Sequence, residues 1–230
     1  MKPFCYNPPM SPLDIIHIDS SIIVLNKPSG VLTVPGRGLT HSDSLLTRVR
    51  EVYFGTLLVH RLDMDTSGII IFARTPSAQA NLGKQFEKRS VKKKYLARTT
   101  GHIKDPHGTI ELPIVVDWPN RPLQKICFDK GKVGITKYRV LKHEEENCSL
   151  VALYPLTGRT HQLRLHMKCI GHPIIGDTLY LDKSKSIKAK KLNLHSSSIK
   201  FLHPKTNKMC TFFTPTPSYF SDRLIDFPSE

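Results

Sequence analysis

The chain has 230 residues, of which 39% are hydrophobic and 23% are charged, and this composition excludes collagen-like, coiled-coil and wholly disordered proteins. Lysine and arginine total 34 against 19 for aspartate and glutamate, so the formal net charge is +15, which favours a polyanionic partner such as nucleic acid. No apolar run is long enough to span a bilayer and no apolar signal segment opens the chain, so we expect a cytoplasmic protein.

The N-terminal half of the sequence predicts short strands separated by two helices. Strands are predicted at 15–18, 22–25, 57–60 and 68–73, and helices at 42–53 and from 76 to about 89. The first helix is amphipathic, with one apolar face made of Leu45, Leu46, Val49, Val52 and Tyr53. The second is expected to start with Thr75 as its cap and Pro76 in its first turn. The glycines and prolines of 28–38 predict a loop.

The C-terminal half is predicted to be rich in strands. They are expected at 93–99, 109–112, 124–128, 136–143, 149–154, 192–196 and 210–213. Helices are expected from 160 to about 170 and, as a short lysine-rich segment, near 183–191. Strands in runs with few helices between them predict an α+β fold with a mixed, mainly antiparallel sheet and flanking helices.

A polar turn between two apolar strands, residues 59–68, concentrates reactive side chains. It contains His60, Arg61, Asp63 and Thr66, and a rigid sheet that presents such a loop is a common arrangement in enzymes. The alternative is a purely structural turn, because Asp, Thr, Ser and Gly also favour turns by bonding to local backbone.

The segment 156–166 predicts a helix whose first turn is basic. Leu163, Met167 and Ile170 would form its buried stripe. His161, Arg164 and Lys168 would form a neighbouring polar stripe, suited to a phosphate or a carboxylate, although a solvated helix face remains the alternative.

Two further groups of residues bear on ligands. Basic residues cluster at 88–95 and at 183–191, and both clusters are expected to be folded basic faces. His166, Cys169 and His172 lie close in sequence, but no fourth ligand completes a zinc site, so we expect no metal. The five cysteines form no C-x-x-C pair, which argues against a disulfide framework, and no glycine-rich nucleotide motif predicts a cofactor.

Four segments in order resemble the motifs of the RluA-type family of RNA pseudouridine synthases. They are NKPSG at 26–30, HRLDMDTSG at 60–68, KKY at 93–95 and GRTHQLR at 158–164. The resemblance covers residues 14 to 214, and the segment DWPNRP at 117–122 is similar to the smaller members of the family. It implies an N-terminal extension at 1–13, a single catalytic domain at 14–230 and no S4-like domain.

The resemblance implies the pseudouridine synthase fold and an isomerase that needs no cofactor. Asp63 would be the catalytic carboxylate, with Arg164 as its basic partner, and Tyr95 would stack under the base and help to remove the C5 proton, with Lys94 adjusting the phenol. The residues expected to contact RNA or the base are Arg61, which would enter the RNA stack, Leu163 in the pocket, and His60, Thr66, Lys27, Arg159, Lys185, Lys188 and Lys190.

The implied partners are stem-loops of tRNA and large-subunit rRNA, modified at a uridine by a monomeric enzyme without membrane or nucleotide cofactor. Two alternatives remain. The first is a non-catalytic RNA-binding or ribosome-assembly factor on the same fold, and the second is a metal-dependent nucleic-acid enzyme that uses the His/Cys cluster.

Overall fold

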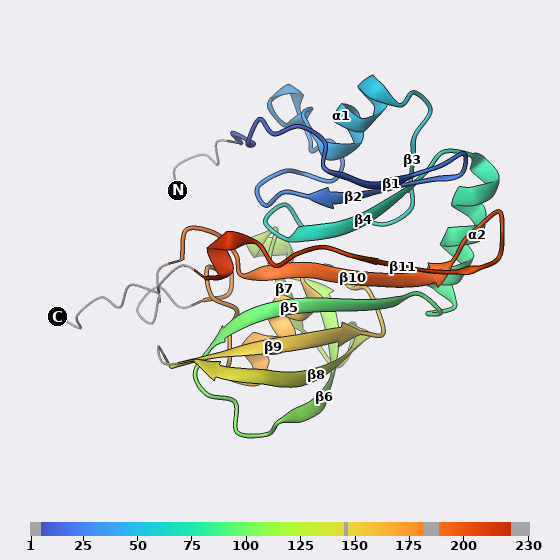
Figure 1. Ribbon diagram of the computed structural model, residues 1–230. Coiled ribbons are helices and arrows are strands. Elements are labelled where there is room, and N and C mark those ends of the chain that lie inside the picture. Colours follow the sequence, from blue (N-terminus) through green and yellow to red (C-terminus); the bar gives the residue numbers. More distant parts are fainter. Residues whose placement is uncertain (1–5, 145–146, 182–188, 222–230) are drawn as a thin grey trace. The chain divides into compact units, whose positions relative to one another are not determined.

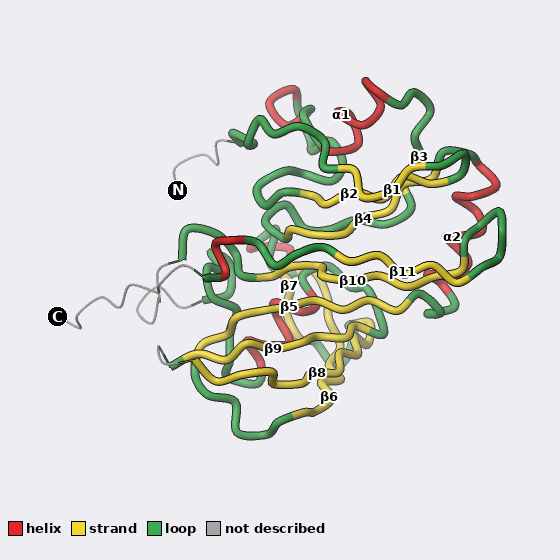
Figure 2. The backbone as a smooth tube through the Cα atoms, in the orientation of Figure 1, coloured by secondary structure: helices red, strands yellow, loops and turns green. Residues whose placement is uncertain are grey.

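The computed structural model of the protein describes residues 6–144, 147–181 and 189–221, and Figure 1 shows their arrangement. Strands predominate over helices in this part of the chain (Figure 2). The structure confirms the predicted α+β class, since the β-strands pair mainly in the antiparallel orientation and α-helices flank them.

The chain divides into two compact units, of which the first comprises Met1–Val91 and Ser198–Thr214. Its strands are β1 (Ile15–Ile18), β2 (Ile22–Lys27), β3 (Leu57–Leu58), β4 (Ser67–Ala73), β11 (Met209–Phe213) and the second part of β10 (Leu194–Leu202). Its helices are α1 (Leu45–Val52), α2 (Pro76–Glu87) and a 3-10 turn at Leu39–His41. Strand β2 lies between β1 and β4, and β11 pairs with β10.

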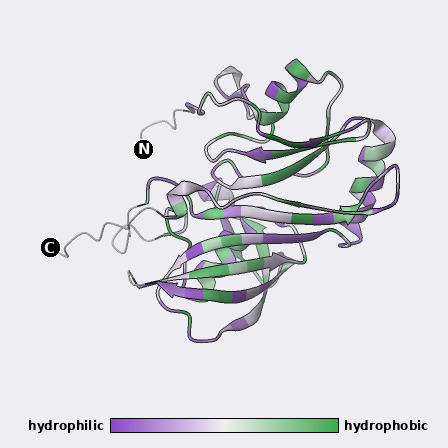
Figure 3. Ribbon diagram, viewed as in Figure 1, coloured by the Kyte–Doolittle hydropathy of each residue, from purple (hydrophilic) through white to green (hydrophobic). Residues whose placement is uncertain are grey.

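The centre of the first unit is β4, in which every residue is buried. The run 69–72 reads IIIF, and β-branched and aromatic side chains of this kind favour a strand covered on both faces. Hydrophobic colour accordingly follows β4 in Figure 3. Helix α2 packs against β4, and it begins as predicted, with Thr75 accepting from the backbone N–H of Ala78 and Pro76 in the first turn.

Helix α1 differs from its prediction at both ends. Ser44 caps it through a reciprocal pair of hydrogen bonds with Thr47, so the helix begins at Leu45 rather than at residue 42. Val49 is fully buried, but Val52 is 64% exposed, so the prediction that Val52 belongs to the buried face is wrong. The reason is local, because the helix ends at Val52 and the next residue leaves the helical conformation.

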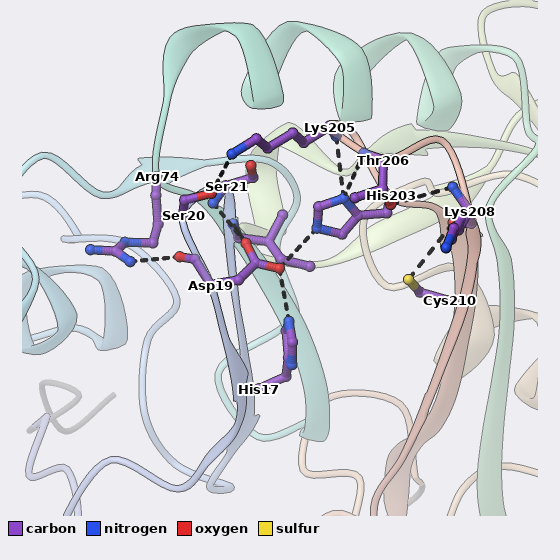
Figure 4. A network of polar contacts seen from close by, with 11 residues as sticks. His17, Asp19, Ser20, Ser21, Arg74, His203, Lys205, Thr206, Lys208 and Cys210 are labelled. Carbon is purple, nitrogen blue, oxygen red and sulfur yellow. Dashed lines mark hydrogen bonds and ion pairs between the residues drawn. The ribbon is translucent and has the colours of Figure 1, made fainter.

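A polar network centred on Asp19 ties two turns of the first unit together (Figure 4). One carboxylate oxygen of Asp19 accepts hydrogen bonds from the backbone N–H groups of Ser21 and Ile22, at 2.7 and 3.0 Å. The other oxygen lies 2.9 Å from Nε2 of both His17 and His203. Burial opposes ionisation of Asp19, but these hydrogen bonds prevail and hold its pKa well below the ordinary value.

The second unit comprises Lys92–Ser197 and Pro215–Glu230. Its strands are β5 (Lys92–Thr100), β6 (His107–Val116), β7 (Gln124–Ile126), β8 (Lys132–Glu144), β9 (Cys148–Pro155) and the first part of β10, and its helix is α3 (Gln162–Cys169). The strand order is β5-β9-β8-β6-β7, and α3 packs against β6 and β8. Leu165 of α3 joins Ile114 of β6 and Tyr180 in a small hydrophobic core. Short 3-10 helices lie at Trp118–Asn120 and Ser218–Phe220.

The predicted strands of the second half are confirmed, and pairing makes most of them longer. β6, for example, runs to Val116 because it pairs with β8 along its length and with β7 near its end. The predicted lysine-rich helix falls largely on residues 182–188, which lie outside the described residues, and 189–191 are not helical.

Candidate active site

Asp63 lies in the loop between β3 and β4, and that loop is bound on one side by the segment after β2. Thr33 donates through Oγ1 to the carbonyl of Leu62 at 2.7 Å and accepts from the Leu62 N–H at 3.2 Å. Ser29 donates to the carbonyl of Asp65 at 2.8 Å. The N–H of Thr66 then donates to the Asp63 carbonyl at 3.2 Å, which closes the turn. The backbone on both sides of Asp63 is therefore held by neighbouring chain, while its side chain is only partly buried.

Lys27, the last residue of β2, holds this loop through hydrogen bonds from its side chain. Its side chain is fully buried, and its ammonium group donates to the carbonyls of Pro28, Val31 and Met64 at 2.9, 2.6 and 2.7 Å. Burial lowers the pKa of Lys27 to about 7, against the opposing effect of the Asp65 and Asp63 carboxylates. The prediction that Lys27 contacts RNA is therefore wrong, because all three of its hydrogen atoms point to backbone oxygens inside the protein.

The other residues of this loop that were predicted to contact RNA differ in their exposure to solvent. Arg61 is exposed, as a residue that enters RNA must be. Thr66 is 2% exposed, so the prediction that it contacts RNA directly is wrong, and its position immediately before the buried strand β4 explains the burial. His60 is half-buried: its Nε2 accepts a hydrogen bond from the N–H of Ile71 at 3.1 Å, and its ring stacks on Phe86, so both contacts are within the protein.

The opening of α3 is built around Gln162. Its Oε1 accepts from the Thr157 hydroxyl at 2.7 Å and from the Arg159 N–H at 3.0 Å, while its Nε2 donates to the Ile135 carbonyl and to Thr136 Oγ1, both at 3.0 Å. A single buried amide thus uses its donors and its acceptor to hold the turn before the helix against β8. Sequence reasoning gave Gln162 no role of its own, because glutamine is mostly an exposed residue.

Arg164 is almost fully buried on α3, at 2% exposure, so the alternative of a solvated helix face is wrong for this residue. Its guanidinium group makes a two-pronged ion pair with Asp177, with Nε–Oδ2 and Nη2–Oδ1 distances of 2.8 and 2.7 Å. Asp177 also accepts from the N–H groups of Leu179 and Tyr180. Asp177 was missed because no periodicity links a loop residue to a helix 13 positions earlier. The predicted buried residues Leu163 and Met167 are confirmed.

Two residues of β5 share one face of the strand, since side chains alternate along it. They are Tyr95, which is buried, and Lys93, which is half-buried; Lys94 points to the other face, so it is not placed to adjust the Tyr95 phenol. Lys93 donates to the carbonyl of Thr157 at 3.3 Å, which joins β5 to the turn before α3. Burial lowers the pKa of Lys93 to about 8.

The remaining predicted ligands are surface residues or lie outside the described part of the chain. Arg159 and Lys190 are exposed, whereas Lys185 and Lys188 lie outside the described residues. No three His, Cys, Asp or Glu side chains of the described residues are grouped so that they could hold a metal ion. His166, one of the three residues considered for zinc, is fully buried and lies 3.0 Å through Nδ1 from Thr136 Oγ1. None of the described helices is long and apolar enough to cross a membrane.

Comparison with known proteins shows which family the chain resembles. The family model for RNA pseudouridylate synthases matches residues 21–168. The dual-specificity RNA pseudouridine synthases RluA of Vibrio parahaemolyticus and Escherichia coli K12 are 45% and 46% identical to the chain, over 93% and 91% of it and 88% and 96% of their own lengths. Among solved structures, human RNA pseudouridylate synthase domain containing 1 is 30% identical, with a TM-score of 0.72 over 94% of this chain and 86% of that one. Human RNA pseudouridylate synthase domain containing 4 is 24% identical and shares the fold, with a TM-score of 0.72 over 90% of each chain.

The family match covers more than half of the chain, and the two bacterial relatives extend it to nearly the whole length. The chain belongs to the RluA-type RNA pseudouridine synthases, isomerases that convert uridine to pseudouridine in RNA.

Proposed function

We propose that Asp63 is the catalytic carboxylate of this isomerase and that its substrates are uridines in RNA stem-loops. The observation that supports Asp63 is the backbone clamp around it, in which Thr33, Ser29 and buried Lys27 hold the residues on either side. A reactive group must be held close to its productive geometry, and so many hydrogen bonds to one loop serve that purpose.

The reaction requires one carboxylate and no electron transfer. The bond from N1 to C1′ breaks, the base turns, a bond from C5 to C1′ forms, and the proton on C5 leaves as N1 gains one. Asp63 acts as a nucleophile at C1′ or the base ring, or as a base at the sugar, and in each route it must be ionised. The uridine leaves the RNA stack for this chemistry, because neither C1′ nor C5 can be worked on inside a helix.

Other residues have supporting roles in this proposal. Arg164 favours the ionised form of Asp63, and Asp177 holds the Arg164 guanidinium in place. Tyr95 stacks under the base and helps to remove the C5 proton, and Leu163 lines the pocket. Exposed Arg61 occupies the position that the uridine leaves.

The family resemblance implies the substrate class. We infer a uridine of a tRNA anticodon loop and one in a large-subunit rRNA hairpin as substrates, and the similar bacterial proteins are named dual-specificity enzymes. Exposed basic residues, among them Arg159 and Lys190, contact phosphates and set orientation rather than sequence. The enzyme acts as a monomer in the cytoplasm.

The test is Asp63→Asn in a single-turnover assay on a tRNA anticodon stem-loop and on an rRNA hairpin. Asparagine keeps the size and the turn-forming capacity of aspartate but lacks the charge. Turnover should be lost while RNA affinity persists, because phosphate contacts supply most of the affinity. Arg164→Met should reduce the rate similarly, and the double variant should cost little more than either change alone.

The competing function is a non-catalytic RNA-binding or ribosome-assembly factor, in which Asp63 only forms a turn. That reading predicts that Asp63→Asn is harmless and that the wild-type protein binds both stem-loops without forming pseudouridine. An Asp63→Asn protein that retains a substantial fraction of the wild-type rate would remove Asp63 from the mechanism.

A further inference from the structure

Lys93 is a half-buried cation with which no carboxylate of the described residues pairs. Its ammonium group makes one hydrogen bond, to the carbonyl of Thr157 at 3.3 Å, which is long for a charged donor. In the part of the chain that the structure describes, it makes no ion pair, and burial alone accounts for the lowering of its pKa to about 8. A partly buried cation without an ion-pair partner destabilises the folded protein, and binding of an anion beside it would offset that destabilisation.

The turn in front of this ammonium group is open. Gly158 is exposed, and a Cβ atom added there would meet only Lys93 Nζ, 4.0 Å away. Gly158 does not have a positive φ angle, so neither the backbone conformation nor crowding by protein atoms requires glycine there. A glycine at such an open position allows another molecule to approach the backbone closely.

A second cation borders the same turn. Arg159 is exposed, its N–H is fixed by Gln162, and its Nε lies 3.4 Å from the carbonyl of Val133. The guanidinium group therefore has an anchor at one edge. Lys93 and Arg159 thus both border the turn at Gly158, a residue that has no side chain.

The ionisable groups on the surrounding elements do not supply a compensating negative charge at neutral pH. The ionisable side chains of β5, β9, β10 and the turn before α3 are lysines, arginines, histidines, tyrosines and one cysteine, and none of these elements contains an aspartate or a glutamate. Burial lowers the pKa of His195 to about 4, so His195 stays neutral where Lys93 titrates.

We propose that Lys93, Gly158 and Arg159 form a binding site for one phosphate group of the RNA backbone, next to the uridine that is modified. The inference rests on the proposed function and names a contact within it. A phosphodiester carries one negative charge and several acceptor oxygens, and it is the anion that an RNA substrate presents at every nucleotide. The Lys93 ammonium and the Arg159 guanidinium contact its oxygens, and Gly158 lets it approach the turn.

Proton linkage gives the site a measurable signature. A bound phosphate raises the pKa of Lys93, so RNA binding is coupled to the uptake of a proton once the pH approaches the pKa that Lys93 has in the free protein. With a free pKa of about 8, the affinity for RNA should fall about fourfold between pH 7 and pH 8.5. Arginine stays charged over this range, so Lys93→Arg should bind with little dependence on pH.

The experiment measures binding of an anticodon stem-loop by fluorescence anisotropy at pH 7 and pH 8.5. Lys93→Met should bind weakly at both values, and Lys94→Met, one residue along on the opposite face of β5, should keep the wild-type dependence. Gly158→Ala places a methyl group where the phosphate approaches, and it should weaken binding about tenfold without changing the melting temperature. Wild-type binding that does not change with pH, or a Gly158→Ala protein with full affinity, would overturn the site.

Two further arms identify the source of the phosphate. Each stem-loop carries one neutral methylphosphonate, placed in turn at the positions beside the uridine. At one of these positions the methylphosphonate should lower the affinity of the wild type for RNA. At that same position it should not lower the affinity of Lys93→Met. If no position behaves in this way while inorganic phosphate shifts the Gly158 amide signal, the site binds free phosphate and the proposal is wrong. Pseudouridine formation on the same stem-loop is scored separately: product formed with pH-independent binding refutes only the phosphate site, whereas absence of product in wild type refutes the proposed function.

Discussion

Replacing Lys27 by methionine measures how a fully buried ammonium group changes the stability of the first unit with pH. Burial lowers the pKa of Lys27 from 10.5 to about 7, although Asp65 and Asp63 act in the opposite direction. Between these two values the unfolded chain holds a proton that the folded protein has released. The free energy of unfolding therefore rises as the pH increases through this range.

The size of the effect follows from the two pKa values. The slope approaches about 1.4 kcal/mol per pH unit, and between pH 7 and pH 9 the free energy of unfolding gains about 2 kcal/mol from Lys27 alone. Urea denaturation of the wild type and of Lys27→Met at pH 7, 8 and 9 gives the comparison, in which the other titrating groups cancel. The wild type should gain about 2 kcal/mol relative to Lys27→Met.

The control for this measurement is Lys104→Met, which removes an exposed lysine and should follow the wild-type curve. Parallel pH dependences for the wild type and Lys27→Met would refute the reasoning, since they would mean that the Lys27 ammonium keeps an ordinary pKa in the folded protein.

Three further outcomes are expected. Asp177→Asn removes one carboxylate from the buried Arg164 guanidinium, so it should lower the free energy of unfolding by about 3 kcal/mol in urea and reduce turnover more than RNA binding. Asp19 has a lowered pKa in the folded protein, so its contribution is present above about pH 4 and is lost as the pH falls further. Asp19→Asn should therefore lower the free energy of unfolding by about 1 kcal/mol at pH 7, a small value because solvent screens this partly exposed carboxylate. The variant should also lose less stability than the wild type as the pH falls below about 4. EDTA should leave turnover unchanged, and a loss of activity that zinc or magnesium restores would contradict that expectation.

The positions of strands and helices were largely predictable, because local patterns carry that information. An uninterrupted β-branched and aromatic run such as 69–72 is typical of a strand covered on both faces, and Thr75 followed by Pro76 is a helix start that needs no tertiary partner. The loop with Asp63 was also predictable, since a polar turn between two apolar strands is visible in the chain. The family resemblance assigned its chemistry.

The partners of polar side chains were decided only by the tertiary structure. Lys27 and Arg164 are cations that hydropathy assigns to the surface, yet both are buried, one against three backbone carbonyls and the other against Asp177. The contact from Lys93 to Thr157 joins residues 64 positions apart. A helix or a strand follows from the preferences of neighbouring residues. A buried charge, in contrast, is stable only where distant segments of the chain bring hydrogen-bond acceptors to it, and the local sequence does not show which distant residues will come together.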